Sequence, residues 1–250
     1  MEDPVPKTDK LPHRRAIYLL PNLLTTMALF AGFFAIISAI KGDFVAAAVA
    51  VFVAMVFDGL DGRVARMTNT QSAFGVQYDS LADIVSFGVA PALVVFLWAL
   101  ESIEGRWGML GAFVYMLSAA IRLARFNVQV EMADKRFFIG LASPAAAAVL
   151  MGMVWVLETR DVDVAPLTGW IWVLIVTIGL LMVSSFPYYS FKTLSPRLKV
   201  SFFSIPIMVL VFVLAMWDFA MTIWLLFTAY AFSAPLWVLW RRGVRLFVRS

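Results

Sequence analysis

The sequence predicts an all-α integral membrane protein with about eight transmembrane helices. Hydrophobic residues make up 62% of the 250 residues and charged residues 14%, whereas soluble globular domains contain roughly 45–50% apolar residues. The apolar residues form runs of about 20, the length that a helix needs to cross a bilayer. The chain has no cysteine and one histidine, His13, which argues against disulfides, thiolate metal sites and Ser–His catalysis.

The predicted spans follow from these apolar runs. In chain order they cover residues 21–40, 44–66, 79–100, 107–126, 143–158, 169–187, 200–217 and 219–240. Before the first span, KLPHRRAIYLL mixes cations with apolar residues, which favours a short interfacial helix at the membrane surface. The polar turn MTNTQSA separates the second and third spans. Pro187, Tyr188 and Tyr189 indicate the end of the sixth span, because aromatic residues gather at membrane interfaces.

The distribution of basic residues predicts the orientation in the membrane. Eight spans put both termini on one side of the membrane. The chain has 20 Lys and Arg residues, and all except Lys41, Arg106 and Arg160 lie on that side. Cytoplasmic loops of membrane proteins carry such an excess. We therefore expect a multi-pass protein of the cytoplasmic membrane with both termini in the cytoplasm. The pI near 9.5 is explained by this topology, so we expect no nucleic-acid partner.

Four aspartates lie on the adjoining ends of the second and third spans, in the stretch DGLDGRVARMTNTQSAFGVQYDSLAD. Asp58 and Asp61 are three residues apart, and Asp79 and Asp83 are four apart, so each pair shares a helix face. The short turn between the helix ends lets both faces point at one volume. Small or cationic residues repeat on the same faces: Gly62, Ala65, Arg66 and Gly75.

Four converging carboxylates repel one another unless cations join them. Two divalent ions would balance the charge, and carboxylate oxygens without His or Cys favour Mg²⁺ or Mn²⁺ over zinc. Magnesium commonly bridges carboxylates and substrate phosphates, so the cluster predicts a phosphate-bearing ligand. Arg66 would donate charge-assisted hydrogen bonds to that phosphate.

The acidic cluster has two other interpretations. Single acids at span ends often decorate a solvated loop, but four acids at helical spacing on adjoining spans argue against this. A cation or proton transporter is the second alternative. Transporters place ionisable residues near the membrane midplane, often with inverted repeats, whereas these aspartates lie at one end of their spans and no repeat is apparent.

The acidic stretch resembles the signature of a known family, the CDP-alcohol phosphatidyltransferases. Their pattern is D-x-x-D-G-x-x-A-R, eight residues, then G-x-x-x-D-x-x-x-D. Every fixed position agrees, at Asp58, Asp61, Gly62, Ala65, Arg66, Gly75, Asp79 and Asp83. The resemblance implies the fold of this family and a dimetal membrane enzyme that transfers a phosphatidyl group from a CDP-linked lipid to an alcohol and releases CMP. It also makes a homodimer plausible.

The resemblance implies a role for each motif residue. The metal ligands would be Asp58, Asp61 and Asp79, with Asp83 as the catalytic base and a further metal contact. CDP-diacylglycerol would be bound by Gly62, Ala65, Arg66 and Gly75, and also by Asn22 and Thr25, which follow Pro21 at the start of the first span. Ordinary hydrogen bonding at a helix start is the alternative role for Asn22 and Thr25.

Three stretches resemble the membrane-embedded phosphatidylserine synthases and imply L-serine as the acceptor: DSLADIVSFGVAPA (79–92), IRLARFNV (121–128) and FIGLASPAAA (138–147). Serine needs a cation for its carboxylate. Arg122 and Arg125 share a helix face and would take it bidentately, although positive-inside anchoring is an equal alternative. Ser86 and Asn127 are further serine-binding candidates. Glycerol 3-phosphate or inositol phosphate remain alternative acceptors, because Lys135 and Arg136 would supply cations for a phosphate.

These expectations divide the chain into three parts. Residues 1–20 form a cytoplasmic N-terminal segment with the interfacial helix. Residues 21–187 form a six-helix catalytic core that opens to the cytoplasm. Residues 188–250 form two additional transmembrane helices and a basic cytoplasmic tail.

Overall fold

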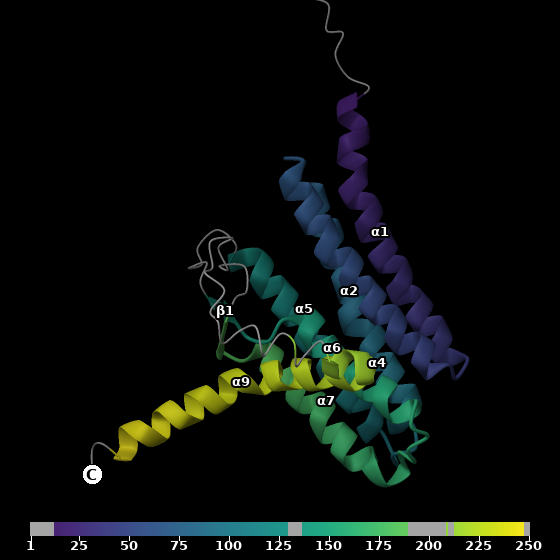
Figure 1. Ribbon diagram of the computed structural model, residues 1–250, viewed down its shortest axis with the longest axis vertical. Coiled ribbons are helices and arrows are strands. Elements are labelled where there is room, and N and C mark those ends of the chain that lie inside the picture. The colour runs from purple at the N-terminus through teal and green to yellow at the C-terminus, as the bar shows by residue number, and fades with distance from the viewer. Residues whose placement is uncertain (1–12, 130–136, 190–208, 210–212, 248–250) are drawn as a thin grey trace, which may run out of the picture.

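The computed structural model describes residues 13–129, 137–189, 209 and 213–247, and most of them are helical (Figure 1). The α-helices are α1 (His13–Ile40), α2 (Phe44–Met67), α3 (Ala73–Asp83), α4 (Ala90–Val95), α5 (Trp107–Gln129), α6 (Ser143–Glu158), α7 (Thr168–Val183) and α9 (Phe219–Phe247). Two π-helices, η1 (Ile84–Val89) and η2 (Phe96–Leu100), and a 3₁₀ turn, η3 (Ala165–Leu167), complete the helical elements. Strands β1 (Phe137–Ile139) and β2 (Pro187–Tyr189) pair antiparallel.

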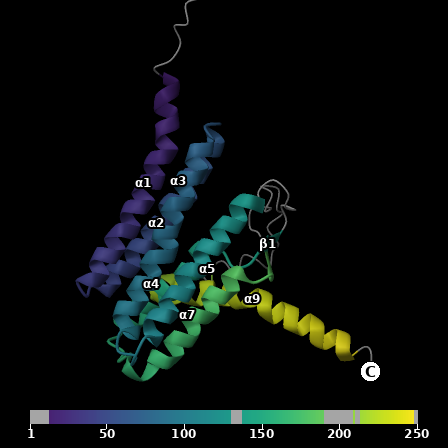
Figure 2. The same ribbon diagram turned by 180° about the vertical axis from the view of Figure 1, so that it is seen from behind.

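The helices form two groups around a central helix. α1 and α2 lie side by side with α3 against α1, and α5 packs on α7 (Figures 1 and 2). α6 lies between the groups, and 12 of its 16 residues are buried. α9 packs on α6, runs at a steep angle to α1 and α2, and leaves the bundle at its C-terminal end (Figure 1).

Large apolar side chains cover the outside of the bundle. Phe30, Val56 and Leu81 are each more than 60% exposed, which suits contact with lipid because acyl chains are as apolar as these side chains. Within the described residues, six helical segments are long and apolar enough to cross a membrane: Leu19–Ile40, Phe44–Met67, Ala73–Leu100, Trp107–Val128, Ala165–Val183 and Phe219–Val238. The protein is therefore a multi-pass membrane protein.

The structure and the eight predicted spans differ in detail. The predicted span 143–158 is a shorter apolar helix of 16 residues. Most of the predicted span 200–217 lies outside the described residues, as do residues 1–12, Lys135 and Arg136, so the count of eight stays a prediction. The third span starts at Ala73 and not at residue 79. Ser72 caps this helix, because its hydroxyl accepts a hydrogen bond from the Gly75 N–H at 3.0 Å.

The segment before the first span is continuous with it. α1 runs from His13 to Ile40 with Pro21 inside the helix, whereas the sequence suggested a separate interfacial helix before residue 21. Proline removes one backbone N–H but leaves its own carbonyl available. The Thr25 hydroxyl approaches that carbonyl to 3.1 Å.

The two π-helices lie within the third span, and the first begins directly after Asp83. η1 packs closely on α1. The Ser86 hydroxyl donates to the Ala28 carbonyl at 3.1 Å, and a Cβ on Gly32 would lie 2.8 Å from the Ser86 Cα. A π-turn widens the helix locally and is frequent at functional sites. It ends the regular α-helical spacing of the span at Asp83.

Candidate active site

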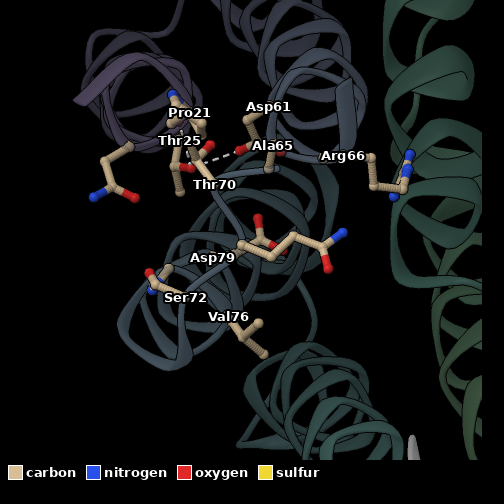
Figure 3. Close-up of a pocket in the computed structure, with 13 residues that line it drawn as sticks. Pro21, Thr25, Asp61, Ala65, Arg66, Thr70, Ser72, Val76 and Asp79 are labelled. Carbon is tan, nitrogen blue, oxygen red and sulfur yellow. Dashed lines mark hydrogen bonds between the residues drawn. The ribbon is translucent and has the colours of Figure 1, made fainter. Parts of the chain in front are cut away.

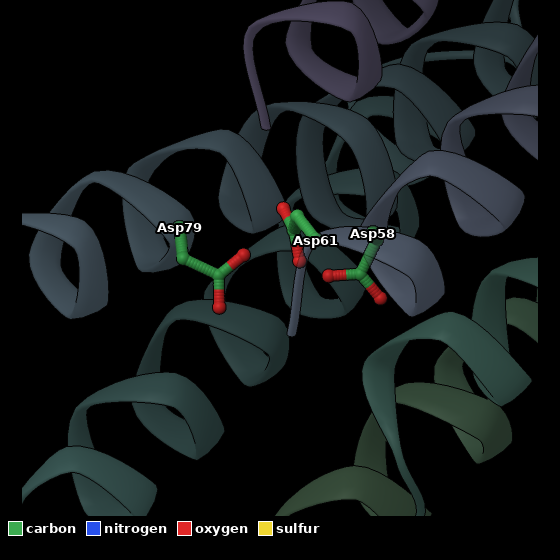
Figure 4. A group of neighbouring side chains, drawn as sticks. All are labelled: Asp58, Asp61 and Asp79. Carbon is green, nitrogen blue, oxygen red and sulfur yellow. The ribbon is translucent and has the colours of Figure 1, made fainter. Parts of the chain in front are cut away.

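Three of the four predicted aspartates, Asp58, Asp61 and Asp79, converge in the structure and are called the acidic cluster below. Asp58 and Asp61 come from the C-terminal half of α2, and Asp79 comes from α3, which packs on the other side of the polar turn (Figure 4). One carboxylate oxygen from each residue lies within 4.8 Å of the others. Asp61 is 4% exposed, and Asp58 and Asp79 are half-buried. Helical spacing and the tight connection thus bring three carboxylates from two helices to one point.

The geometry of this cluster fits a divalent metal ion. A hard cation with oxygen ligands at about 2.1 Å separates opposite ligands by about 4.2 Å. The three carboxylate oxygens lie within 4.8 Å of one another, which is close to this span. The set contains only carboxylate oxygens, and such ligands suit Mg²⁺ or Mn²⁺. Asp58, Asp61 and Asp79 would hold the metal.

Asp83 lies one turn beyond Asp79, at the end of α3. Its carboxyl group lies within hydrogen-bonding reach of Asp58, and it interacts electrostatically with Asp79 and with Arg122 of α5. Asp83 is thus close to Asp58 of the cluster and within the electrostatic influence of a guanidinium. This position lets it exchange a proton with a molecule bound between the cluster and Arg122.

Thr25 of α1 orients the most buried ligand. Its hydroxyl donates to Asp61 Oδ2 at 2.6 Å (Figure 3), and Thr25 itself is 4% exposed. Groups that hydrogen-bond a metal-binding side chain keep it in the ligating orientation, and their loss typically weakens metal binding roughly 10- to 100-fold.

We expect Thr25→Val to lower the Mn²⁺ affinity of the purified protein about tenfold, because valine keeps the shape of threonine but cannot orient Asp61. Isothermal titration calorimetry in detergent measures this affinity directly. Thr26→Val is the matched control, since the Thr26 hydroxyl contacts the Asn22 carbonyl and the Tyr78 hydroxyl and no cluster residue. Equal affinities of the two variants would contradict the orienting role.

A cleft of about 250 Å³ opens beside the cluster (Figure 3). Its walls come from the segment of α1 around Pro21, the end of α2, the polar turn and the first turns of α3. Asp61 and Asp79 lie at its edge. All six residues predicted to bind the nucleotide-linked lipid line this cleft: Asn22, Thr25, Gly62, Ala65, Arg66 and Gly75.

The small residues keep the cleft open. A Cβ on Gly75 would approach the Ser72 hydroxyl to 3.2 Å and the Asn22 Oδ1 to 3.5 Å, and one on Gly62 would meet the Arg66 guanidinium at 3.6 Å. Arg66 also interacts electrostatically with Asp61. The cleft therefore pairs a positive group with the acidic cluster, an arrangement that suits a phosphate bridged to a metal.

The four predicted acceptor-binding residues lie in different surroundings. Arg122 donates from Nη1 to the Ser143 hydroxyl at 3.0 Å, while its buried Nε has no hydrogen-bond partner. Arg125 donates to the carbonyls of Val183 at 3.0 Å and Ile139 at 2.7 Å, so it satisfies the end of α7. The Arg125 guanidinium is thereby engaged by the backbone, whereas the buried Nε of Arg122 has no hydrogen-bond partner.

Ser86 and Asn127 also make contacts within the protein. Ser86 is fully buried against α1 through its bond to the Ala28 carbonyl. The Asn127 amide donates to the Ser80 hydroxyl at 3.0 Å and so ties the end of α5 to α3. Of the four candidates, Arg122 is the one that interacts electrostatically with Asp83.

Several residues around the site were not selected from the sequence. Thr70, Gln71 and Ser72 of the polar turn line the cleft, and Ser143 accepts from Arg122. The polar turn carried a signal, since its serine precedes a helix as an N-cap does. The bond between Ser143 and Arg122 joins positions 21 residues apart, so no local pattern in the sequence predicts it.

Known proteins resemble this chain over the residues that form the site. The family model for CDP-alcohol phosphatidyltransferases matches residues 18–183. A CDP-diacylglycerol–serine O-phosphatidyltransferase of Helicobacter pylori (strain J99) is 41% identical over 198 residues, which cover 79% of this chain and 83% of that protein. The protein of the same name from Methanocaldococcus jannaschii is 36% identical over 138 residues, 55% of this chain and 61% of that protein. The one from Saccharomyces cerevisiae is 35% identical over 150 residues, 54% and 53% of the two chains.

Proposed function

The chain belongs to the CDP-alcohol phosphatidyltransferase family, and we propose that it is a phosphatidylserine synthase. It transfers the phosphatidyl group of CDP-diacylglycerol to the hydroxyl of L-serine and releases CMP. The observation that carries this proposal is the convergence of Asp58, Asp61 and Asp79 beside a cleft lined by the family motif. The names of its relatives support serine as the acceptor.

The cleft between α1, α2 and α3 binds the nucleotide-diphosphate part of the lipid. Arg66 contacts the diphosphate with charge-assisted hydrogen bonds. The first turn of α3 lines the same cleft through Gly75 and Val76, and a helix N-terminus presents backbone N–H groups that favour a phosphate. Asn22 and Thr25 complete the wall on the side of α1.

The acidic cluster is the metal site of this enzyme. Proteins of the family are generally divalent-metal dependent, and we infer two Mg²⁺ or Mn²⁺ ions held by Asp58, Asp61 and Asp79, with Asp83 as a further contact. When bound, the ions neutralise phosphate oxygens and stabilise the attacking and leaving oxygens of an in-line displacement.

Asp83 acts as the general base. It accepts the proton of the serine hydroxyl as the serine oxygen forms a bond to the lipid-proximal phosphorus, and the bond from this phosphorus to the CMP oxygen breaks. General-base catalysis requires the base within hydrogen-bond reach of that hydroxyl. A serine bound at Arg122 would lie near Asp83, because Arg122 and Asp83 interact electrostatically.

Arg122 binds the serine carboxylate. Its Nε is buried and unpartnered, and a buried donor without a partner is costly unless a ligand satisfies it. A guanidinium also matches the geometry of a carboxylate. Glycerol 3-phosphate and inositol phosphate remain the competing acceptors, and the experiment below separates them.

The membrane orientation follows from the basic loops. We infer that the site opens to the cytoplasmic leaflet of the cell membrane and that both termini are cytoplasmic, since the positive-inside rule assigns the end that carries Arg63, Arg66, Arg122 and Arg125 to that side. We also propose that the protein forms a homodimer.

We expect the purified protein to release CMP from CDP-diacylglycerol when L-serine and Mg²⁺ or Mn²⁺ are present, and to stop when EDTA removes the metal. CMP release is measured with L-serine, glycerol 3-phosphate and inositol phosphate in parallel. Release with a phosphate acceptor but not with serine would overturn the serine assignment. Cation flux in liposomes without CMP release from any acceptor would instead support a transporter.

A further inference from the structure

A hydroxyl at the start of α6 holds the guanidinium of Arg122. Arg122 Nη1 donates to the Ser143 hydroxyl at 3.0 Å, and Ser143 is the first residue of α6. A guanidinium has N–H donors and no acceptor, so the hydroxyl oxygen is the acceptor in this bond. Ser143 is 0% exposed, so no water from outside the protein takes the place of Nη1. Ser143 therefore restricts the orientations that the guanidinium adopts.

The backbone that leads into Ser143 is fixed by hydrogen bonds to the end of α7 and to the residues before β2. The Gly140 N–H donates to the Phe186 carbonyl at 2.9 Å. The Leu141 N–H donates to the Leu181 carbonyl at 3.0 Å. Gly140 has a φ of +83°, a left-handed conformation that glycine adopts without strain. This turn thus sets where α6 begins and where the Ser143 hydroxyl lies.

Arg125 fastens the same turn to α5. Its Nη2 donates to the Ile139 carbonyl at 2.7 Å, and an added Cβ on Gly140 would lie 2.8 Å from that nitrogen. Arg122 lies three residues earlier on α5 and bonds to Ser143, four residues after Ile139. The two arginines thus hold the turn at both ends. The position of the Arg122 guanidinium is therefore tied to the backbone through two separate side-chain contacts.

The hydrogen bond at Nη1 also determines where the rest of the guanidinium points. The group is planar and its N–H donors form a rigid fork, so a partner that fixes one nitrogen limits the directions of the others. The Nε of Arg122 is buried and without a partner in the part of the chain that the structure describes. In the proposed function, Arg122 binds the carboxylate of the acceptor. The Ser143 hydroxyl would orient the group for that contact.

We propose that Ser143 is a positioning residue for acceptor binding, whose hydroxyl holds the Arg122 guanidinium in the orientation that binds the carboxylate of an amino-acid acceptor. This inference rests on the proposed function and deepens it. Ser143 acts through Arg122 and does not touch the acceptor itself, because it is fully buried. Its loss should therefore weaken binding of the acceptor and leave the metal site and the cleft for CDP-diacylglycerol as they are.

The test compares wild type and Ser143→Ala as purified full-length proteins, with CMP release measured at varied L-serine and varied CDP-diacylglycerol. Loss of a hydrogen bond to a charged group corresponds to about tenfold in affinity or more. We expect KM for L-serine to rise about tenfold, whereas kcat and KM for CDP-diacylglycerol should stay within about twofold. A purely structural role would instead lower kcat or the temperature of unfolding without this selective change in KM.

Two single variants separate positioning from packing. Ser118→Ala removes another buried hydroxyl, which donates to the Val114 carbonyl within α5 at 2.7 Å, and it should leave KM for L-serine unchanged. Ser143→Thr keeps a hydroxyl and should hold KM for L-serine within about threefold of wild type. A Ser143→Thr protein that unfolds at the wild-type temperature but has the KM of Ser143→Ala would contradict the inference.

A double substitution tests whether Ser143 acts through Arg122. Arg122→Met removes the guanidinium and should lower kcat/KM for L-serine by itself, and adding Ser143→Ala should lower it no further, because coupled residues do not contribute additively. Losses that multiply, or an unchanged KM for L-serine in Ser143→Ala, would overturn the inference and leave the proposed function standing. A wild-type protein without serine-dependent CMP release would overturn the proposed function itself.

Discussion

Asp83→Asn is expected to lower kcat by about 10² to 10⁴, the range by which a positioned general base accelerates a reaction. Asparagine has nearly the same shape but cannot accept the serine proton. Affinities for Mn²⁺ and for CDP-diacylglycerol should change by less than about tenfold, because Asp58, Asp61 and Asp79 still converge without Asp83. CMP release gives kcat, and calorimetry gives the two affinities.

The control for this variant is Asp43→Asn. Asp43 caps the opposite end of α2 by accepting from the Ala46 N–H at 2.9 Å, and asparagine caps helices as well as aspartate does. The control should keep its activity. If Asp83→Asn loses metal binding and turnover to the same degree, Asp83 is a ligand and the base must be sought elsewhere.

Asp61→Asn is expected to abolish CMP release, with kcat/KM lower by about 10³ or more. The metal ions stabilise transition-state charge by several kcal/mol, and each 1.36 kcal/mol corresponds to a tenfold change in rate. Asp61 is the most buried of the three converging ligands, so water does not readily take its place. Mn²⁺ titrations of activity and of binding measure the loss.

A double substitution tests why Asp61 matters. Thr25 acts through its 2.6 Å hydrogen bond to Asp61, so adding Thr25→Val to Asp61→Asn should cause almost no further loss, because coupled residues do not contribute additively. Independent losses that multiply would show that Thr25 contacts the substrate by another route. Asp61→Asn with near wild-type activity would overturn the metal assignment.

The composition and the hydrophobic runs were sufficient to predict a helical membrane protein. Runs of about 20 apolar residues have few alternatives to a transmembrane helix, because the backbone must satisfy its own hydrogen bonds in lipid. The residues at which the helices begin and end were less predictable. Ser72 as an N-cap starts the third span six residues early, and a proline at position 21 does not end α1, since neighbouring groups in the fold compensate for local preferences.

The acidic site could be predicted because it is local in sequence. Asp58 to Asp83 span one helix end, one turn and the next helix, and helical periodicity determines which of these side chains share a face. The six residues predicted to bind the nucleotide-linked lipid line one cleft. Four of them belong to the same stretch of sequence as the aspartates, and Asn22 and Thr25 belong to the start of the first span.

The sequence could not distinguish the roles of the residues predicted to bind the acceptor. Arg122 and Arg125 have equivalent positions on a helix face in the sequence, but the end of α7 engages Arg125 through its carbonyls, whereas Arg122 faces Asp83. Ser86, a further candidate, lies in the π-helix after Asp83 and bonds to the Ala28 carbonyl of α1. The surroundings of Arg122, Arg125 and Ser86 therefore depend on long-range packing, which local periodicity does not encode.

The sequence by itself therefore determined the membrane class, the family motif and the metal-binding acids, because each depends on composition or on spacing within a helical turn. Only the tertiary structure decided that Thr25 bonds to Asp61 and that the Nε of Arg122 is buried without a partner while Arg125 bonds to backbone carbonyls. These contacts join residues 36 or more positions apart or depend on what the rest of the fold has already engaged. Their geometry is set when the helices pack.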